Sequence, residues 1–394
     1  MNVLTSEAAQ LKRAVSEAVD DLGPTLLDVS HRIHSTPETA FNEHQASAWL
    51  AEAAEAEGLQ VQRPAYGVDT AFAADFGDPK LPRVAILSEY DALPDIGHGC
   101  GHNIIAAIGL GSALALARLG DTLPGAVRYV GTPAEERGCG KELLAHAGAW
   151  DGVDAAMMLH PANLDMKAVR TQYLADATVT FTGHTAHAAL AAEAARSALD
   201  AVVLAYQALA QLRPHLKPTE RISGVINEGG STPNVTPETT VSSYFVRAAT
   251  QADLDVLKRR AEACFRGAAE ATGCVLDVTW AGDDYRDMRI NEPLADAYQV
   301  NAESFGRVFT PYERFPIGGS DMSNVSHRVP VLHGIIASAP EDTQLHTRAF
   351  TAQGVSQMAD QAVLDGAKAL AMTAIDFLTD SQLRRRVRET FAAD

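Results

Sequence analysis

The sequence has few cysteines and few positive charges for its length, and it has no long apolar run. Four cysteines in 394 residues cannot form the dense disulfide framework of a small secreted domain. The 32 Lys and Arg residues against 50 Asp and Glu give a formal net charge of −18, which argues against binding to nucleic acid or anionic membranes. No apolar run reaches the roughly 20 residues that a membrane-spanning helix needs.

The N-terminal segment carries charges throughout and has no hydrophobic core of a signal peptide. We therefore expect a cytoplasmic protein. Hydrophobic residues make up 46% of the chain, so it has ample material for a core, and its length predicts two domains.

Segments of strand and helix character alternate over residues 1–174, which indicates an α/β domain. From residue 175 the pattern becomes β-α-β-β-α-β, the order of a ferredoxin-like α+β domain, and it continues to residue 282. The α/β pattern then resumes over 283–394. The N-terminal region predicts two helices, over 6–22 and 26–34, and 315–326 is predicted to be a polar, glycine-rich loop.

The stretch EYDALPDIGHGCGHN, residues 89–103, lies between a strand-like run and an apolar helical run. Cys100 and His102 are two residues apart, so both side chains can point to the same side of an extended loop. A thiolate and an imidazole in such an arrangement are a plausible half of a transition-metal site.

Three further strand-end loops carry ligand-type residues: Glu135 with Glu136, then His160, then His346. Because strand-end loops of one sheet converge, these groups could meet and supply a two-metal site. Adjacent carboxylates point in different directions, so one could bind metal while the other acts as a general base. An exposed acidic pair is the alternative interpretation.

With these motifs the chain resembles the M20 metallopeptidases, specifically the amidohydrolase branch with aminobenzoyl-glutamate hydrolase, aminoacylase-like dipeptidases and auxin-conjugate hydrolases. The motifs that carry the resemblance occur in order along nearly the whole chain: EYDALPDIGHGCGHN, GTPAEERGCGK, MMLHPAN, FTGHTAHAAL, STPNVTP, GGSDMSNVSH and LHT. The resemblance implies a catalytic domain with a mixed sheet flanked by helices, as in zinc peptidases. It also implies that the inserted domain is a lid through which two chains form a homodimer.

The resemblance also assigns roles to individual residues. It implies two divalent metal ions, Mn²⁺ or Zn²⁺ with Co²⁺ possible, and Glu135 as the general base. In the lid, His187 would polarise the scissile carbonyl across the dimer, and Asn234 and Arg247 would hold the oxyanion side and a substrate carboxylate. The implied metal ligands and the implied substrate-loop glycines are Cys100, His102, Glu136, His160, His346, Gly318 and Gly319.

The resulting hypothesis is an amidohydrolase in which a metal-bridging water attacks the amide bond of an N-acyl or N-aroyl amino acid or a dipeptide. Asn103 and His184 depart from the family pattern, and both leave the substrate class open. One alternative is a hydrolytic deaminase of an aromatic or related amine on the same scaffold. A binding protein with a degenerate site and a structural zinc site are two further alternatives.

Overall fold

The computed structural model describes residues 3–314 and 318–393, and the chain divides into two compact units. The first unit comprises Met1–Arg170 and Met288–Asp394, and the second comprises Thr171–Asp287. The sequence-based boundaries at 175 and 282 lie a few residues inside the second unit. Within the described residues, no helix is both long enough and apolar enough to cross a bilayer.

The first unit is built on a five-stranded sheet in the order β1-β3-β2-β4-β9. β1 pairs with β3 in an antiparallel manner and the other neighbours are parallel, so the sheet is mixed, as predicted. The carboxyl ends of the four parallel strands therefore meet at one edge of the sheet. The five strands are β1 (Phe72–Gly77), β2 (Arg83–Glu89), β3 (Ala126–Thr132), β4 (Ala155–Ala162) and β9 (Val331–Ala337).

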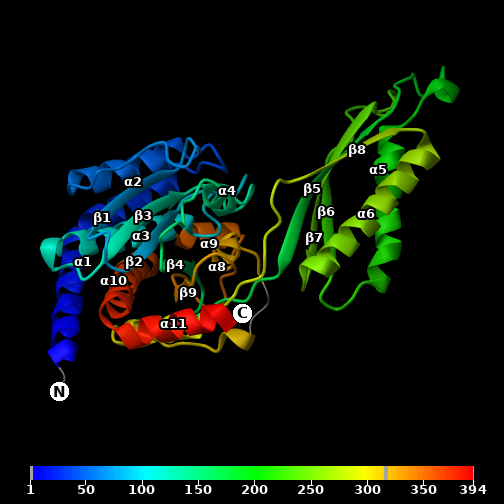
Figure 1. Ribbon diagram of the computed structural model, residues 1–394. Coiled ribbons are helices and arrows are strands. Elements are labelled where there is room, and N and C mark those ends of the chain that lie inside the picture. The colour runs from blue at the N-terminus through cyan, green and yellow to red at the C-terminus, as the bar shows by residue number, and fades with distance from the viewer. Residues whose placement is uncertain (1–2, 315–317, 394) are drawn as a thin grey trace. The chain divides into compact units, whose positions relative to one another are not determined.

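Helices cover both faces of this sheet (Figure 1). On one face, α3 (His102–Ala117) lies against the sheet and is buried almost all round, with α1 and α10 packed on it. On the other face, the core joins the sheet to α4 and α8. The remaining bounds are α1 (Val3–Ser35), α2 (His44–Ala56), α4 (Gly140–His146), α7 (Glu292–Glu303), α8 (Met322–Ser326), α9 (Arg348–Gln353), α10 (Gln357–Thr379) and α11 (Ser381–Ala393).

Two expectations about local structure were wrong. The two N-terminal helices are one continuous helix, α1, which contains Pro24. Leu22 and Leu26, four residues apart on one face, are both buried, and their packing outweighs the hydrogen bond that the proline removes. The expected loop over 315–326 contains α8, and residues 315–317 lie outside the described residues.

The second unit is a four-stranded antiparallel sheet in the order β6-β7-β5-β8. Apolar residues from its two helices and its strands form one core, separate from that of the first unit. This element order and strand order are those of a ferredoxin-like fold. Its elements are β5 (Tyr173–Thr182), α5 (Ala198–Leu212), β6 (Arg221–Glu228), β7 (Thr239–Ala248), α6 (Gln251–Thr272) and β8 (Val275–Trp280).

Candidate active site

The structure brings the five predicted metal ligands together at the carboxyl edge of the first unit's sheet. Cys100 Sγ lies 3.5 Å from His160 Nε2 and 3.4 Å from His346 Nε2. Glu136 Oε1 lies 3.9 Å from the Nε2 atoms of both His102 and His346. Two groups of three ligand-type residues result, Cys100 with His102 and His160, and Cys100 with Glu136 and His346. Cys100 belongs to both groups.

The loops that carry these residues contain backbone conformations that few residue types tolerate. Gly101 has φ of +79°, and a Cβ there would lie 2.7 Å from Pro161 Cγ, so this position requires glycine. Ala134, Cys139 and His346 also have positive φ without being glycine. Such strain persists only where the surroundings enforce it, and it is concentrated at functional sites.

Asp91 orients two of the site residues, although no role was predicted for it. Its Oδ1 lies 3.1 Å from His102 Nδ1, and its Oδ2 accepts a hydrogen bond of 2.9 Å from the Glu136 amide. His160 Nδ1 lies 2.7 Å from the Pro161 carbonyl oxygen, to which it donates. Both histidines therefore present Nε2 to the site. Metal-binding histidines usually engage a carboxylate or carbonyl in this way, so a supporting carboxylate is expected, but the sequence does not indicate which acidic residue supplies it.

The site gathers several buried carboxylates. Burial, with the nearby charges of Glu89 and Glu136, raises the pKa of Glu135 well above its ordinary value. Burial also raises the pKa of Glu136 to about 7. The pKa of His160 falls to about 4, mainly through burial, so its imidazole is neutral and able to bind a cation.

Three polar atoms in the site are buried and have no hydrogen-bond partner: Glu89 Oε1, His102 Nε2 and Glu136 Oε1. Unpaired buried acceptors are costly, and cations bound at the two ligand groups would satisfy all three. Thiolate, imidazole and carboxylate groups together suit Zn²⁺, Mn²⁺ or Co²⁺. The residues present therefore fit a metal centre.

A buried lysine also belongs to this region, and nothing in the sequence distinguishes it from an exposed one. Lys141 Nζ bonds to Glu89, and it bonds to Asp321 Oδ1 at 2.6 Å. Asp321 follows the glycines predicted to contact substrate. Of those two, Gly318 donates its amide to the Arg170 carbonyl oxygen at 3.0 Å, and Gly319 is exposed.

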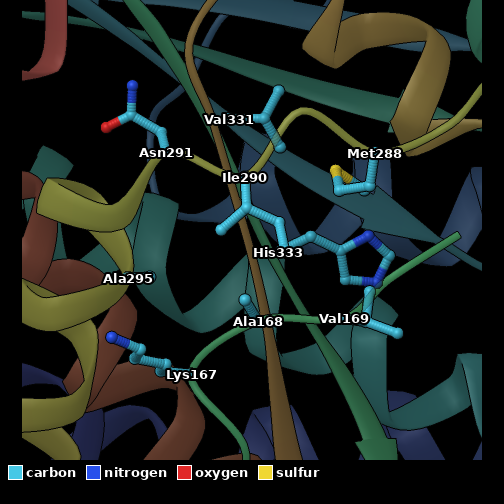
Figure 2. A pocket seen from close by; sticks show the side chains of 9 residues that line it. All are labelled: Lys167, Ala168, Val169, Met288, Ile290, Asn291, Ala295, Val331 and His333. Atoms are coloured by element: carbon cyan, nitrogen blue, oxygen red, sulfur yellow. The ribbon is translucent and has the colours of Figure 1, made fainter. Parts of the chain in front are cut away.

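Two histidines without an expected role are buried near the site. His333 on β9 stacks on His160, with ring centroids 6.0 Å apart, and it lines a small cavity (Figure 2). Burial holds its pKa well below the ordinary value, so the ring is neutral. His98 stacks on His34, and it belongs to none of the ligand groups found among the described residues.

The predicted substrate residues of the second unit are not all together. His187 forms a bridge with Val235, and Ala188 donates to the Asn234 carbonyl oxygen at 3.2 Å, so His187 and Asn234 are neighbours and both are exposed. Arg247 instead pairs with Leu174 near the opposite end of β7. Arg247 is eight positions along the strand from Thr239 at the other end, a distance of roughly 26 Å.

Comparison with the sequence profiles of protein families finds a match to Peptidase family M20/M25/M40 over residues 85–374. The chain belongs to this family. This confirms the family resemblance, and with it a hydrolase that acts on amide C–N bonds.

Relatives of this M20 peptidase cover almost the whole chain. It is 39% identical to the Xaa-Arg dipeptidase of Mus musculus, over 98% of this chain and 94% of the relative. It is 28% identical to one component of the p-aminobenzoyl-glutamate hydrolase of Escherichia coli, over 96% and 94% of the two chains. The crystal structure of the aminobenzoyl-glutamate utilization protein from Klebsiella pneumoniae has the same fold. Its TM-score is 0.73 at 20% identity, over 92% of this chain and 98% of that chain.

Proposed function

We propose that this protein is a two-metal hydrolase of small amides, either dipeptides or N-acyl amino acids. The observation that carries the proposal is the pair of ligand groups that share Cys100, with the buried carboxylate of Glu135 beside them. A structural zinc site would use a single closed set of four ligands and would not need the extra carboxylate.

One cation would be held by Cys100, His102 and His160, and the other by Cys100, Glu136 and His346. Two divalent cations in such a site polarise a carbonyl and make a water more acidic. Glu135 suits the role of general base, because neither group that contains Cys100 uses its side chain. Its carboxylate would take the proton of the attacking water and return it to the departing nitrogen.

The second unit would bind the substrate. The planar guanidinium of Arg247 suits a substrate carboxylate, and burial lowers its pKa without removing its charge. His187 and Asn234 would act on the carbonyl. Roughly 26 Å of strand lies between Arg247 and Thr239, which exceeds the length of any dipeptide, and His187 and Asn234 belong to the segments beyond the Thr239 end. One rigid unit would therefore not bring all three residues to one substrate. This separation supports a homodimer in which each site uses His187 and Asn234 from the other chain.

Among dipeptides, we place those that end in arginine first. Support for this choice comes from the mouse relative, which is named an Xaa-Arg dipeptidase and aligns over nearly the full length of both chains. N-aroyl amino acids come second because of the Escherichia coli relative. Release of free ammonia without a new amino acid would instead indicate the deaminase alternative.

Replacement of the proposed base tests the mechanism. We expect Glu135→Gln to lower kcat at least about 100-fold, the scale of general-base removal, while both cations remain bound. Turnover of Ala-Arg and metal content, both measured on purified protein, check this expectation. Glu142→Gln is the matched control, since Glu142 is a buried carboxylate on α4 that pairs with Arg328. Unchanged turnover in Glu135→Gln would contradict the role.

A further inference from the structure

We propose that Glu89 is an additional ligand of the cation at His102. Lys141 would orient the Glu89 carboxylate toward that cation. The inference rests on the proposed cation pair and adds a residue to it. Glu89 is the last residue of β2, one of the parallel strands at whose ends the site lies, and its side chain is fully buried.

One ring nitrogen of His102 has no hydrogen-bond partner. Its Nδ1 faces Asp91, so Nε2 is the nitrogen available to the site. Glu89 Oε1 lies 3.1 Å from this Nε2, yet neither atom has a hydrogen-bond partner, because they are not aligned for a hydrogen bond. When Nε2 carries no hydrogen, both atoms are acceptors. A cation between two buried acceptors that face the same point would satisfy both of them.

The separation of the two atoms fits a shared cation. Two ligand atoms that each lie about 2.1 Å from one ion, at angles of about 90–110°, are about 3.0–3.4 Å apart. The observed 3.1 Å falls in this range. Ligands of one ion point at the ion and not at each other, which agrees with the poor alignment for a hydrogen bond. Glu89, His102 and Glu135 also form a group of ligand atoms by themselves.

Lys141 explains why Oε1 is the oxygen that faces the site. Its Nζ bonds to Oε2 of Glu89 and to Oδ1 of Asp321, and its main-chain amide donates to Oδ2 of Asp321 at 2.9 Å. The carboxylate of Glu89 is thus fixed through one oxygen and free at the other. Among the described residues, Lys141 is the only buried lysine or arginine. A fully desolvated ammonium in this position holds one rotamer of Glu89 in place.

An asymmetry between the two cations follows. The cation at His102 would have Cys100, His160 and Glu89 as further ligands, whereas the other cation would have Cys100, Glu136 and His346. The cation with the additional carboxylate would bind more tightly and would be loaded first.

The test compares Glu89→Gln with Asp321→Asn in the full-length protein. Each change removes one of the two carboxylate charges that pair with Lys141. Both oxygens of Asp321 accept hydrogen bonds from Lys141, so Asp321 has no oxygen free for a cation. We expect Glu89→Gln to weaken one of the two Zn²⁺ sites by about 10–100-fold in equilibrium dialysis. We expect Asp321→Asn to keep both affinities within about threefold, and only Glu89→Gln to change the absorption bands of Co²⁺-loaded protein.

Equal effects of the two changes would overturn the inference, because Glu89 would then act through its charge alone. Unchanged Zn²⁺ affinities and Co²⁺ bands in Glu89→Gln would also overturn it. If Glu89→Gln does not fold, Glu89→Asp replaces it, since the shorter side chain keeps the charge but withdraws the free oxygen. Wild-type Zn²⁺ affinity in that variant would count against the inference. Wild-type protein that binds no cation would instead contradict the proposed function itself.

Discussion

Glu43 is a single residue whose protonation couples the stability of the protein to pH. Its Oε1 accepts a hydrogen bond of 2.8 Å from the Ala134 amide, directly before Glu135. Burial, with the nearby charge of Asp91, raises the pKa of Glu43 from 4.5 to about 7. Between these two values the folded protein binds more protons than the unfolded chain, so the contribution of Glu43 to stability is lost as the pH rises through about 7.

Replacement by the neutral isostere should remove this pH dependence. Between pH 5 and pH 8, we expect wild type to lose about 2 kcal/mol of unfolding free energy relative to Glu43→Gln. Urea denaturation of chelator-treated protein at both pH values measures the difference. Glu52→Gln, at an exposed position of α2, serves as the control and should show no such change. Parallel pH profiles of wild type and Glu43→Gln would refute the expectation.

At this same residue scale, the sequence could single out the candidate ligand and base residues that the fold brings together, whereas it could not single out the residues that support them. Cys100, His102 and the adjacent Glu135 and Glu136 stand out because strand-end loops rarely concentrate such groups. Asp91 could not be distinguished from the other acidic residues of its stretch, because its role depends on which histidine nitrogen it faces. Tertiary distances decide that, and no sequence spacing encodes them.

The burial of Lys141 could not be predicted from the sequence either. A lysine at the start of a short helix predicts an exposed side chain, since lysine is almost never fully buried unless it is paired. Here Glu89 and Asp321, from two distant parts of the chain, supply the pairing. Only the packed sheet brings the three residues together.

At the scale of elements, hydrophobic periodicity located most helices and strands, but it did not locate their ends. The prediction of two separate N-terminal helices was wrong, because burial of the leucines that flank Pro24 keeps α1 continuous. α8 is short and forms within a glycine-rich, polar segment, so its sequence has no helical period to detect.

The contact between α3 and β2 positions the site, because α3 begins at His102 and β2 ends at Glu89. Gly109 allows this contact. A Cβ at Gly109 would lie 2.3 Å from the Leu87 carbonyl oxygen, which is backbone and cannot move aside. The helix would have to shift away from the strand.

We therefore expect Gly109→Ala to lower the unfolding free energy by about 1–3 kcal/mol, the usual range for overpacking, and to weaken metal binding. Gly267→Ala is the matched control, since Gly267 lies in helix α6 and a Cβ there would meet nothing within 4 Å. That change should be neutral or should stabilise by about 0.5–1 kcal/mol. Thermal melts and Zn²⁺ titration of both variants check the pair. Equal behaviour of the two variants would show that the helix–strand contact tolerates a methyl group.

At the scale of the whole molecule, the change of pattern near residue 175 and the return near 283 indicated a second unit. The strand–helix order predicted its fold, because β-α-β-β-α-β has few compact arrangements. Sequence could not reveal that Arg247 lies near one end of β7 while His187 and Asn234 belong to the segments beyond the other end. Arg247 is thirteen positions after Asn234 in the chain, and this spacing becomes a long distance only because most of these residues form an extended strand.

This separation leads to a prediction about assembly. If His187 serves the site of the other chain, then His187→Ala and Glu135→Gln are each inactive alone, but mixed dimers regain one intact site. Co-expression of the two variants with different affinity tags should yield heterodimers with up to about half of the wild-type activity per dimer. Purified heterodimers without activity would indicate that every site uses the His187 of its own chain.

The insertion of the second unit also sets the order in which a ribosome completes the site. Cys100 and His346 are 246 residues apart in the sequence, and the entire second unit lies between the strands that carry the two halves of the site. At bacterial or eukaryotic elongation rates, ribosomes need about 12–50 s to synthesise that interval. During this time β9 and His346 are missing, so the nascent sheet has an open edge and the metal centre is incomplete. Hydrolysis therefore begins only after nearly the whole chain has been made.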